Sequence, residues 1–239
     1  IESDIQDAIE GVRQNPFDPK KEGQEYSTLV RSILRRDPDV VGVGELPDAA
    51  TAKEMCRGDQ ERTRQYVLLR SKGGLQDIQM WCKAVGDLPT AAGALHGVIA
   101  GTLVRKLCPN CRVGYTPSAD MLKKLGLPAD KVPQLFKKGG QVLIKNKPET
   151  CPMCSGGGYF GQEGVFEIFP VGPAERELVK SGNLAALRAE FRKRGYPTLQ
   201  QAALLKAVEG ITSIEEIMRV TSAGESKKPA AAAPAGQSA

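Results

Sequence analysis

Two Cys-x-x-Cys pairs, CPNC at 108–111 and CPMC at 151–154, account for four of the six cysteines in the chain. Each pair presents two sulfurs from one tight turn, and zinc prefers four thiolates at the corners of a tetrahedron. The pattern predicts one zinc ion with these ligands: Cys108, Cys111, Cys151 and Cys154. Four protein ligands leave no open position for a substrate, so we expect the metal to be structural.

The segment between the pairs, residues 112–150, is longer than the commonest zinc-ribbon spacing and contains a helix-like stretch, SADMLKKLGL. An inserted element of this kind still allows the two turns to meet. Two disulfides or four unligated thiols are the alternatives; a reducing cytosol disfavours the first, and the matched pairs disfavour the second. Cys56 and Cys82 stand alone, and we expect both to be small buried residues.

The composition is that of a folded globular protein, with 239 residues, 41% hydrophobic and 26% charged. No apolar stretch approaches the roughly 18 to 20 residues of a membrane helix, and no signal-peptide pattern opens the chain, which favours a cytosolic protein. Because the sequence begins at Ile1 rather than Met, we expect its true start to lie upstream; a genuinely short gene product is the alternative. The net charge of +5 permits an anionic partner without demanding one.

The first part of the chain alternates helical and strand-like patterns. We expect a helix over 26–35, a buried strand over 40–43, a helix from Ala49 to Met55 capped by Asp48, and a strand over 66–69. Apolar helices are then expected over 75–85 and 90–107. Strand, turn and helix in this order are typical of a parallel α/β sheet.

The last part of the chain is predicted to be helical. One helix is expected between Pro173 and Gly182, and capping-box spacings at Thr198/Gln201 and Thr212/Glu215 predict two more. Residues 221–239 are rich in Ala, Pro, Gly and Ser and are predicted to be a disordered tail. We therefore divide the chain into a core over 1–107, a tetracysteine subdomain over 108–170 and a helical cap over 171–220.

A lone carboxylate, Glu45, follows the strand in DPDVVGVGEL at 37–46. Many nucleotide hydrolases place a glutamate at the end of a strand to polarise the attacking water. A solvated surface residue is the alternative interpretation of any glutamate at this position.

Four segments resemble the hexameric type II secretion and type IV pilus assembly ATPases. They are LVRSILRRDPDVVGVGELPDAATA at 29–52, LHGVIAGTLVRKLCPNC at 95–111, CPMCSGGGYFGQEGVFEIF at 151–169 and RGYPTLQQAALLKAVEGITSIEEIMRVT at 194–221. In order and spacing they are similar to the family's Walker B segment, the segment entering its tetracysteine module, that module and its C-terminal helices.

The resemblance implies a partial RecA-like P-loop NTPase core, an α/β fold, followed by a zinc subdomain and a helical cap. It also implies a homo-oligomeric, hexameric motor in the cytoplasm, peripheral on the inner membrane and docked on a platform protein there. Such a motor uses ATP and Mg²⁺ to assemble pilins or pseudopilins. Glu45 falls on the Walker B glutamate, which would orient or activate the attacking water.

The chain departs from the family in three places. It contains no G-x-x-x-x-G-K-[ST] loop, which lies upstream in the family. In the family, the segment after the Walker B helix carries a histidine that senses the γ-phosphate. The corresponding segment here, QERTRQYVLLRSKGG at 60–74, has no histidine. In the turn after Glu45, Pro47 replaces the arginine of the family. A non-catalytic structural subunit of the same machinery is therefore the alternative hypothesis. The single histidine, His96, is expected on an apolar helix as a packed or helix-surface residue.

A zinc-ribbon nucleic-acid binder is the third hypothesis, suggested by the basic run RAEFRKRG at 188–195 and a sequence pI near 8.9. The spacing of Phe191 within that run favours the solvated face of a helix. Aromatic residues make up only 5% of the chain and offer few stacking platforms for bases, so we expect no nucleic-acid partner.

Overall fold

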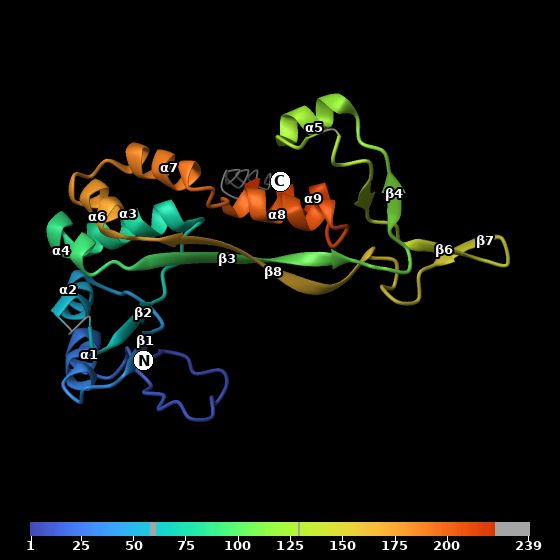
Figure 1. Ribbon diagram of the computed structural model, residues 1–239. Helices are drawn as coiled ribbons and strands as arrows, with labels where there is room; N and C mark the ends of the chain where they lie inside the picture. The colour runs from blue at the N-terminus through green and yellow to red at the C-terminus, as the bar shows by residue number, and fades with distance from the viewer. Residues whose placement is uncertain (58–60, 129, 223–239) are drawn as a thin grey trace, which may run out of the picture. The chain divides into compact units, whose positions relative to one another are not determined.

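The computed structural model describes residues 1–57, 61–128 and 130–222 (Figure 1). The chain divides into two compact units. Unit 1 consists of Ile1–Gly101 and Glu167–Thr198, and unit 2 of Thr102–Phe166 and Leu199–Ala239. The limits differ from the three successive subdomains expected from the sequence, because each unit takes residues from two separate stretches of the chain.

Unit 1 contains the alternating α/β pattern that the sequence predicts. Its elements in chain order are α1 (Tyr26–Leu34), β1 (Val40–Val43), α2 (Ala49–Arg57), β2 (Arg64–Val67), α3 (Gly74–Val85), α4 (Leu88–Gly93), the start of β3 (Gly97–Leu107), the end of β8 (Tyr159–Pro170), α6 (Pro173–Lys180) and α7 (Leu184–Lys193). Strands β1 and β2 pair in parallel, with Val40 opposite Arg64 and Val43 opposite Val67. The Asp48 carboxylate accepts a hydrogen bond from the Thr51 N–H at 2.7 Å, which confirms Asp48 as the cap of α2.

Two hydrophobic clusters hold unit 1 together. One is built on Val30, Val41, Val43, Met55 and Trp81, from the sheet and helices α1 to α3. The other brings helices α3, α4, α6 and α7 onto the end of β8. Within it the rings of Phe169 and Phe191 stack with centroids 4.4 Å apart, which joins α7 to the strand.

The predicted helix over 90–107 is wrong for most of its length. A short helix, α4, ends at Gly93, and Gly97–Leu107 forms strand β3, which pairs with β8. The burial pattern explains the difference. From Gly97 to Val104 the residues alternate between exposed and buried or half-buried, which is the period of two expected for a strand. His96 is exposed just before this strand, rather than on the apolar helix expected from the sequence.

Unit 2 contains the cysteine pairs and the elements around them. Its elements are the rest of β3, β4 (Val113–Tyr115), α5 (Ala119–Leu125), β5 (Leu135–Lys137), β6 (Gln141–Ile144), β7 (Lys147–Thr150), the start of β8, α8 (Leu199–Val208) and α9 (Ile214–Ser222). Strands β4 and β5 pair antiparallel, as do β6 and β7. Helices α8 and α9 pack on the buried face of β3 and β8 through Val104, Val165, Leu204 and Ile217.

The C-terminal helices form as predicted but do not make one cap. Helices α6 and α7 belong to unit 1, whereas α8 and α9 belong to unit 2. The cap of α9 is Ser213, whose hydroxyl accepts from the Glu216 N–H at 3.1 Å, one residue beyond the expected Thr212. Helix α9 continues to Ser222, and residues 223–239 of the predicted tail lie outside the described residues. Among the described helices, none has the length and apolar character needed to cross a membrane.

Candidate functional site

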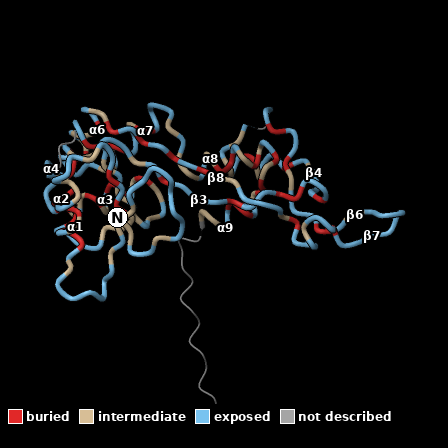
Figure 2. The backbone as a smooth tube through the Cα atoms, turned by 90° about the horizontal axis from the view of Figure 1, so that it is seen from below, coloured by how far each residue is buried: buried red, intermediate tan, exposed pale blue. Residues whose placement is uncertain are grey.

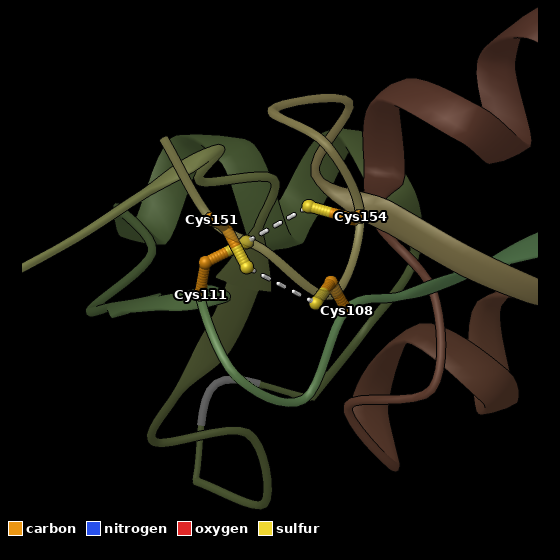
Figure 3. A group of neighbouring side chains, drawn as sticks. All are labelled: Cys108, Cys111, Cys151 and Cys154. Atoms are coloured by element: carbon orange, nitrogen blue, oxygen red, sulfur yellow. Dashed lines mark hydrogen bonds between the residues drawn. The ribbon is translucent and has the colours of Figure 1, made fainter. Parts of the chain in front are cut away.

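The four paired cysteines lie together in unit 2 (Figure 3). Cys108 and Cys111 follow β3, and Cys151 and Cys154 lie between β7 and β8. Their sulfurs all lie within 4.8 Å of one another, with Cys108 Sγ 3.8 Å from Cys151 Sγ and Cys111 Sγ 3.6 Å from Cys154 Sγ. Tetrahedral zinc–thiolate bonds of about 2.3 Å require sulfurs about 3.8 Å apart. The residues present therefore fit a tetrahedral zinc ion.

Hydrogen-bond donors surround these sulfurs. The N–H of Gly140 donates to Cys111 Sγ and that of Gly158 to Cys154 Sγ, each at 3.2 Å, and the Asn110 amide donates to Cys151 Sγ at 3.4 Å. Donors of this kind stabilise thiolates and orient metal ligands. This second layer was not predicted from the sequence, apart from the general richness of the region in glycine.

Close backbone approach explains two of the glycines beside the cluster. A Cβ atom on Gly139 would lie 1.8 Å from the carbonyl oxygen of Cys111. Gly140 has a φ of +119° and its Cβ would lie 2.5 Å from the Gly156 oxygen. Side chains at these positions would push the segment after β5 away from the cysteine turn. The adjacent glycines at 139–140 are the sequence signal that could have revealed this packing.

The thiols of the cluster differ in acidity. Burial raises the pKa of Cys111 to about 12. Burial also opposes ionisation of Cys151, but the backbone N–H of Cys154 and the Asn110 amide donate to its sulfur and lower its pKa to about 6. A divalent cation would supply the positive charge that the remaining thiolates need in order to form.

The two single cysteines lie outside this cluster. Cys56 and Cys82 are half-buried and pack against the first core of unit 1. Burial raises the pKa of the Cys56 thiol to about 11 and also raises that of Cys82. Both therefore behave as small packed residues, although neither is fully buried.

Glu45 belongs to unit 1 and follows β1 by two residues. Its side chain is half-buried, and the Ser3 hydroxyl donates a hydrogen bond to its carboxylate. The N–H of Gly44 donates to the Ile1 carbonyl at 2.9 Å, which holds the opening residues against the end of β1. A carboxylate in this position can accept a hydrogen bond from a water molecule and orient it.

Tyr26, in the first turn of α1, lies close enough to Glu45 for the carboxylate to affect the pKa of its hydroxyl. Burial and the nearby Glu45 carboxylate raise the pKa of the Tyr26 hydroxyl to about 12. That hydroxyl donates to the Ile1 carbonyl at 3.1 Å. The Glu45 carboxylate thus lies near the buried ring of Tyr26.

The residues that depart from the expected family pattern occupy the same unit. Pro47 lies in the turn between β1 and α2, and residues 61–73 contain β2 and the loop before α3 without a histidine. Gln60, the first residue of that segment, lies outside the described residues. His96 is separate from the segment in sequence and contacts the Ala94 carbonyl, with Nδ1 at 3.4 Å.

The basic run at 188–195 forms the outer side of helix α7 and the turn after it. Phe191 is buried, while Arg188, Arg192 and Lys193 are exposed. Arg194 forms ion pairs with the buried Glu175 at 2.8 Å and with Glu190 at 3.0 Å. The run therefore has the structure of a core helix with a solvated face, as its spacing predicts.

The structure combines a mixed α/β unit with a tetracysteine module, the two parts that the resemblance to the secretion ATPases implies. The family model described as "Type II/IV secretion system protein" matches residues 1–219, and the chain belongs to that family. The type IV pilus assembly ATPase PilB of Pseudomonas aeruginosa is 31% identical over 221 residues, covering 92% of this chain and 37% of PilB. The type II secretion system ATPase E of Vibrio cholerae is 30% identical over 223 residues, covering 92% of this chain and 42% of that protein. The chain thus spans less than half the length of these relatives.

Solved structures agree on the fold. The pilus retraction motor PilT with bound ADP superposes with a TM-score of 0.52 and 16% identity, over 86% of this chain and 45% of PilT. The ATPase DotB of Legionella pneumophila gives a TM-score of 0.54 and 13% identity, over 83% of this chain and 42% of DotB. These likenesses support the α/β ATPase fold expected from the sequence.

Proposed function

We propose that this chain is the C-terminal part of a type II secretion or type IV pilus assembly ATPase. In this role it couples ATP binding and hydrolysis to the assembly of pilins or pseudopilins and to protein secretion. The observation that carries the proposal is the family match across residues 1–219, together with relatives about equally similar from pilus assembly and from secretion.

Glu45 is proposed as the catalytic residue, orienting the water that attacks the terminal phosphate of ATP. Its place just after a parallel strand, with the carboxylate half-buried, supports this role. Bound Mg²⁺ would neutralise charge on the phosphates. The chain contains no G-x-x-x-x-G-K-[ST] loop, so this role would require a phosphate-binding loop supplied from outside this sequence.

The tetracysteine cluster is proposed to bind structural zinc through Cys108, Cys111, Cys151 and Cys154. The sulfur spacing and the N–H donors around it support that role. We further propose that the protein acts as a homo-hexamer in the cytoplasm, peripheral on the inner membrane and docked on a platform protein, without a nucleic-acid partner. Family membership supports the assembly and docking assignments, and the aromatic content of only 5% supports the absence of a nucleic-acid partner.

A second candidate function is a non-catalytic subunit of the same machinery. Pro47 in the turn after Glu45 and the absence of histidine from 60–74 favour it, because both positions depart from the pattern that the family resemblance implies. Such a subunit would keep the fold, the zinc site and the docking helices without turnover.

Phosphate release by the longest natural chain that contains residues 1–239 distinguishes these functions. We expect Glu45→Gln to lower turnover by at least about 100-fold, as for loss of a general base. Asp39→Asn, exposed just before the same strand, is the matched control and should leave turnover unchanged. Equal turnover in Glu45→Gln and the unaltered protein would contradict the catalytic role. Absence of turnover, with secretion or piliation still dependent on the protein, would establish the non-catalytic subunit.

A further inference from the structure

In the β6–β7 hairpin, the outer edge of strand β6 is not paired with any other strand of the described chain. Figure 1 shows the two strands paired with each other alone, and Figure 2 shows them largely exposed. Leu143 is 75% exposed and Ile144 41% exposed. At its base the half-buried Val142 packs against the tetracysteine cluster, which anchors the hairpin.

The turn of the hairpin determines which backbone groups face outward. Lys145 and Asn146 have φ of 50° and 61°, the signature of a two-residue primed turn. In such a hairpin the flanking residues, Ile144 and Lys147, form a hydrogen-bonded pair, and hydrogen-bonded pairs then recur at every second position. The Cys151 N–H donates to the Gly140 carbonyl at 2.9 Å, as this alternation requires. The N–H and C=O groups of Gln141 and Leu143 therefore point away from β7.

The two edges of the hairpin are not equivalent. On β7 the outward position opposite Leu143 is Pro148, which has no N–H to offer. Proline is a common way to block an edge strand against further pairing. Strand β6 is Gln-Val-Leu-Ile, without proline or charge, so its edge can accept another strand.

The charge around β6 is mainly positive. Lys137, Lys138, Lys145 and Lys147 flank it, and Glu149 is the only acidic residue between 137 and 150. Lys138 pairs with Glu215 at 2.8 Å, whereas Lys137, Lys145 and Lys147 form no ion pair within the described part of the chain. An approaching segment would therefore meet an apolar strand between unneutralised ammonium groups.

We propose that β6 is a docking edge for an extended, acidic segment of a partner protein, which adds to the hairpin as a third strand. The backbone of that segment pairs with the N–H and C=O groups of Gln141 and Leu143. Its apolar side chains cover Leu143, and its carboxylates lie beside Lys145 and Lys147. A second copy of this chain is a poorer occupant, because edge-to-edge pairing of two β6 strands would bring lysines of both copies together.

The test is an NMR titration of the zinc-loaded, ¹⁵N-labelled chain with a capped peptide in which glutamate alternates with valine. The peptide is added to about 1 mM, a concentration at which weak binding can still be measured. We expect amide shifts concentrated at Gln141 and Leu143. Leu143→Pro removes an outward N–H and leaves the hairpin's own ladder intact. It should weaken binding by about 3- to 10-fold, the effect of one lost backbone hydrogen bond.

Leu143→Ala is the matched control for the side chain, since it keeps the N–H, and it should weaken binding less than proline does. Lys145→Gln combined with Lys147→Gln tests the charges without altering the backbone, and it should weaken binding and reduce its salt dependence. Retained zinc and unchanged Gly140 and Cys151 signals show that each variant is folded.

Several results would overturn the proposal. These are equal binding by Leu143→Pro and the unaltered chain, shifts confined to other elements, no shifts at all, or equal binding of a peptide with lysine in place of glutamate. Concentration-dependent shifts at β6 without peptide would assign the edge to a second copy. Shifts there with phosphatidylglycerol vesicles but not with peptide would assign it to a membrane surface.

Discussion

The guanidinium of Arg105 holds the carboxylate of Glu216, a residue 111 positions further along the chain. Arg105 Nη2 lies 2.6 Å and Nε 3.0 Å from Glu216 Oε2, and the Arg105 backbone N–H donates to Oε1 at 3.0 Å. Arg219, one turn further along α9, donates to the same carboxylate at 2.6 and 2.8 Å. The side chain of Glu216 has no exposed surface, so this network fixes α9 on β3 from within unit 2.

Replacing Glu216 by alanine should loosen α9. Removal of its charged hydrogen bonds is expected to lower the local free energy of unfolding by about 2 to 3 kcal/mol. The loss is no larger than this because the side chains of Arg105 and Arg219 reach solvent. Hydrogen exchange of the α9 amides measures the effect. Glu215→Ala is the matched control, since its pair with Lys138 is exposed and should contribute less than about 1 kcal/mol. Equal exchange in the two variants would rule out a special role for Glu216.

The same carboxylate predicts a pH dependence. Burial opposes ionisation of Glu216, but the hydrogen bonds from Arg219 and Arg105 outweigh it and lower its pKa to about 2, from an ordinary value of 4.5. A lowered pKa in the folded state gives stability that is present above pH 4.5 and is lost as the pH falls toward 2. Urea unfolding should therefore show the stability difference between the unaltered chain and Glu216→Gln shrinking over this window. Both proteins keep the same cysteines, so metal release in acid acts on both, and a difference that stayed constant would refute the assignment.

Zinc content tests the tetracysteine cluster. We expect one zinc ion per purified chain by elemental analysis, and its loss or strong reduction in Cys151→Ser, because three thiolates bind the ion more weakly than four. Cys82→Ser, outside the cluster, should retain the metal. Chelation should also expose the segment after β5 to protease. A metal-free chain with an equally resistant segment would show that the cluster does not need an ion.

The glycine beside Cys111 gives an independent test of the same site. Gly139→Ala places a Cβ atom on the Cys111 carbonyl, so the turn must move and zinc affinity should fall by about 10-fold or more, as for other supports of metal ligands. Competition with a chromogenic chelator measures the affinity. Gly93→Ala is the control, because no atom lies within 4 Å of the added Cβ. Unchanged affinity in Gly139→Ala would mean that the turn can shift without disturbing the sulfurs.

Features that depend on residues close together in the sequence were predictable from it. The spacing of Cys108 and Cys111, the Asp48 cap and the buried strand β1 all follow local rules. Strand β3 was not predictable in the same way, because its apolar residues also suit a helix and its pairing with β8 is set by residues far along the chain. Glu216 was missed for the same reason, since nothing near it in the sequence indicates Arg105. The support from Gly139 was missed because it acts by the absence of a side chain.

The convergence of the four sulfurs also holds the two ends of residues 112–150 together at one point. Lengthening a flexible loop whose ends are already held costs little, about 0.6 kcal/mol for each doubling. Extra residues at the exposed tip of the β6–β7 hairpin therefore cost little. Leu122, Val132 and Leu135 of the same segment must be kept, because they pack with Val208 and Ile214 of the C-terminal helices. The exposed Lys145–Asn146 turn is accordingly a natural place to graft a tag or a binding peptide.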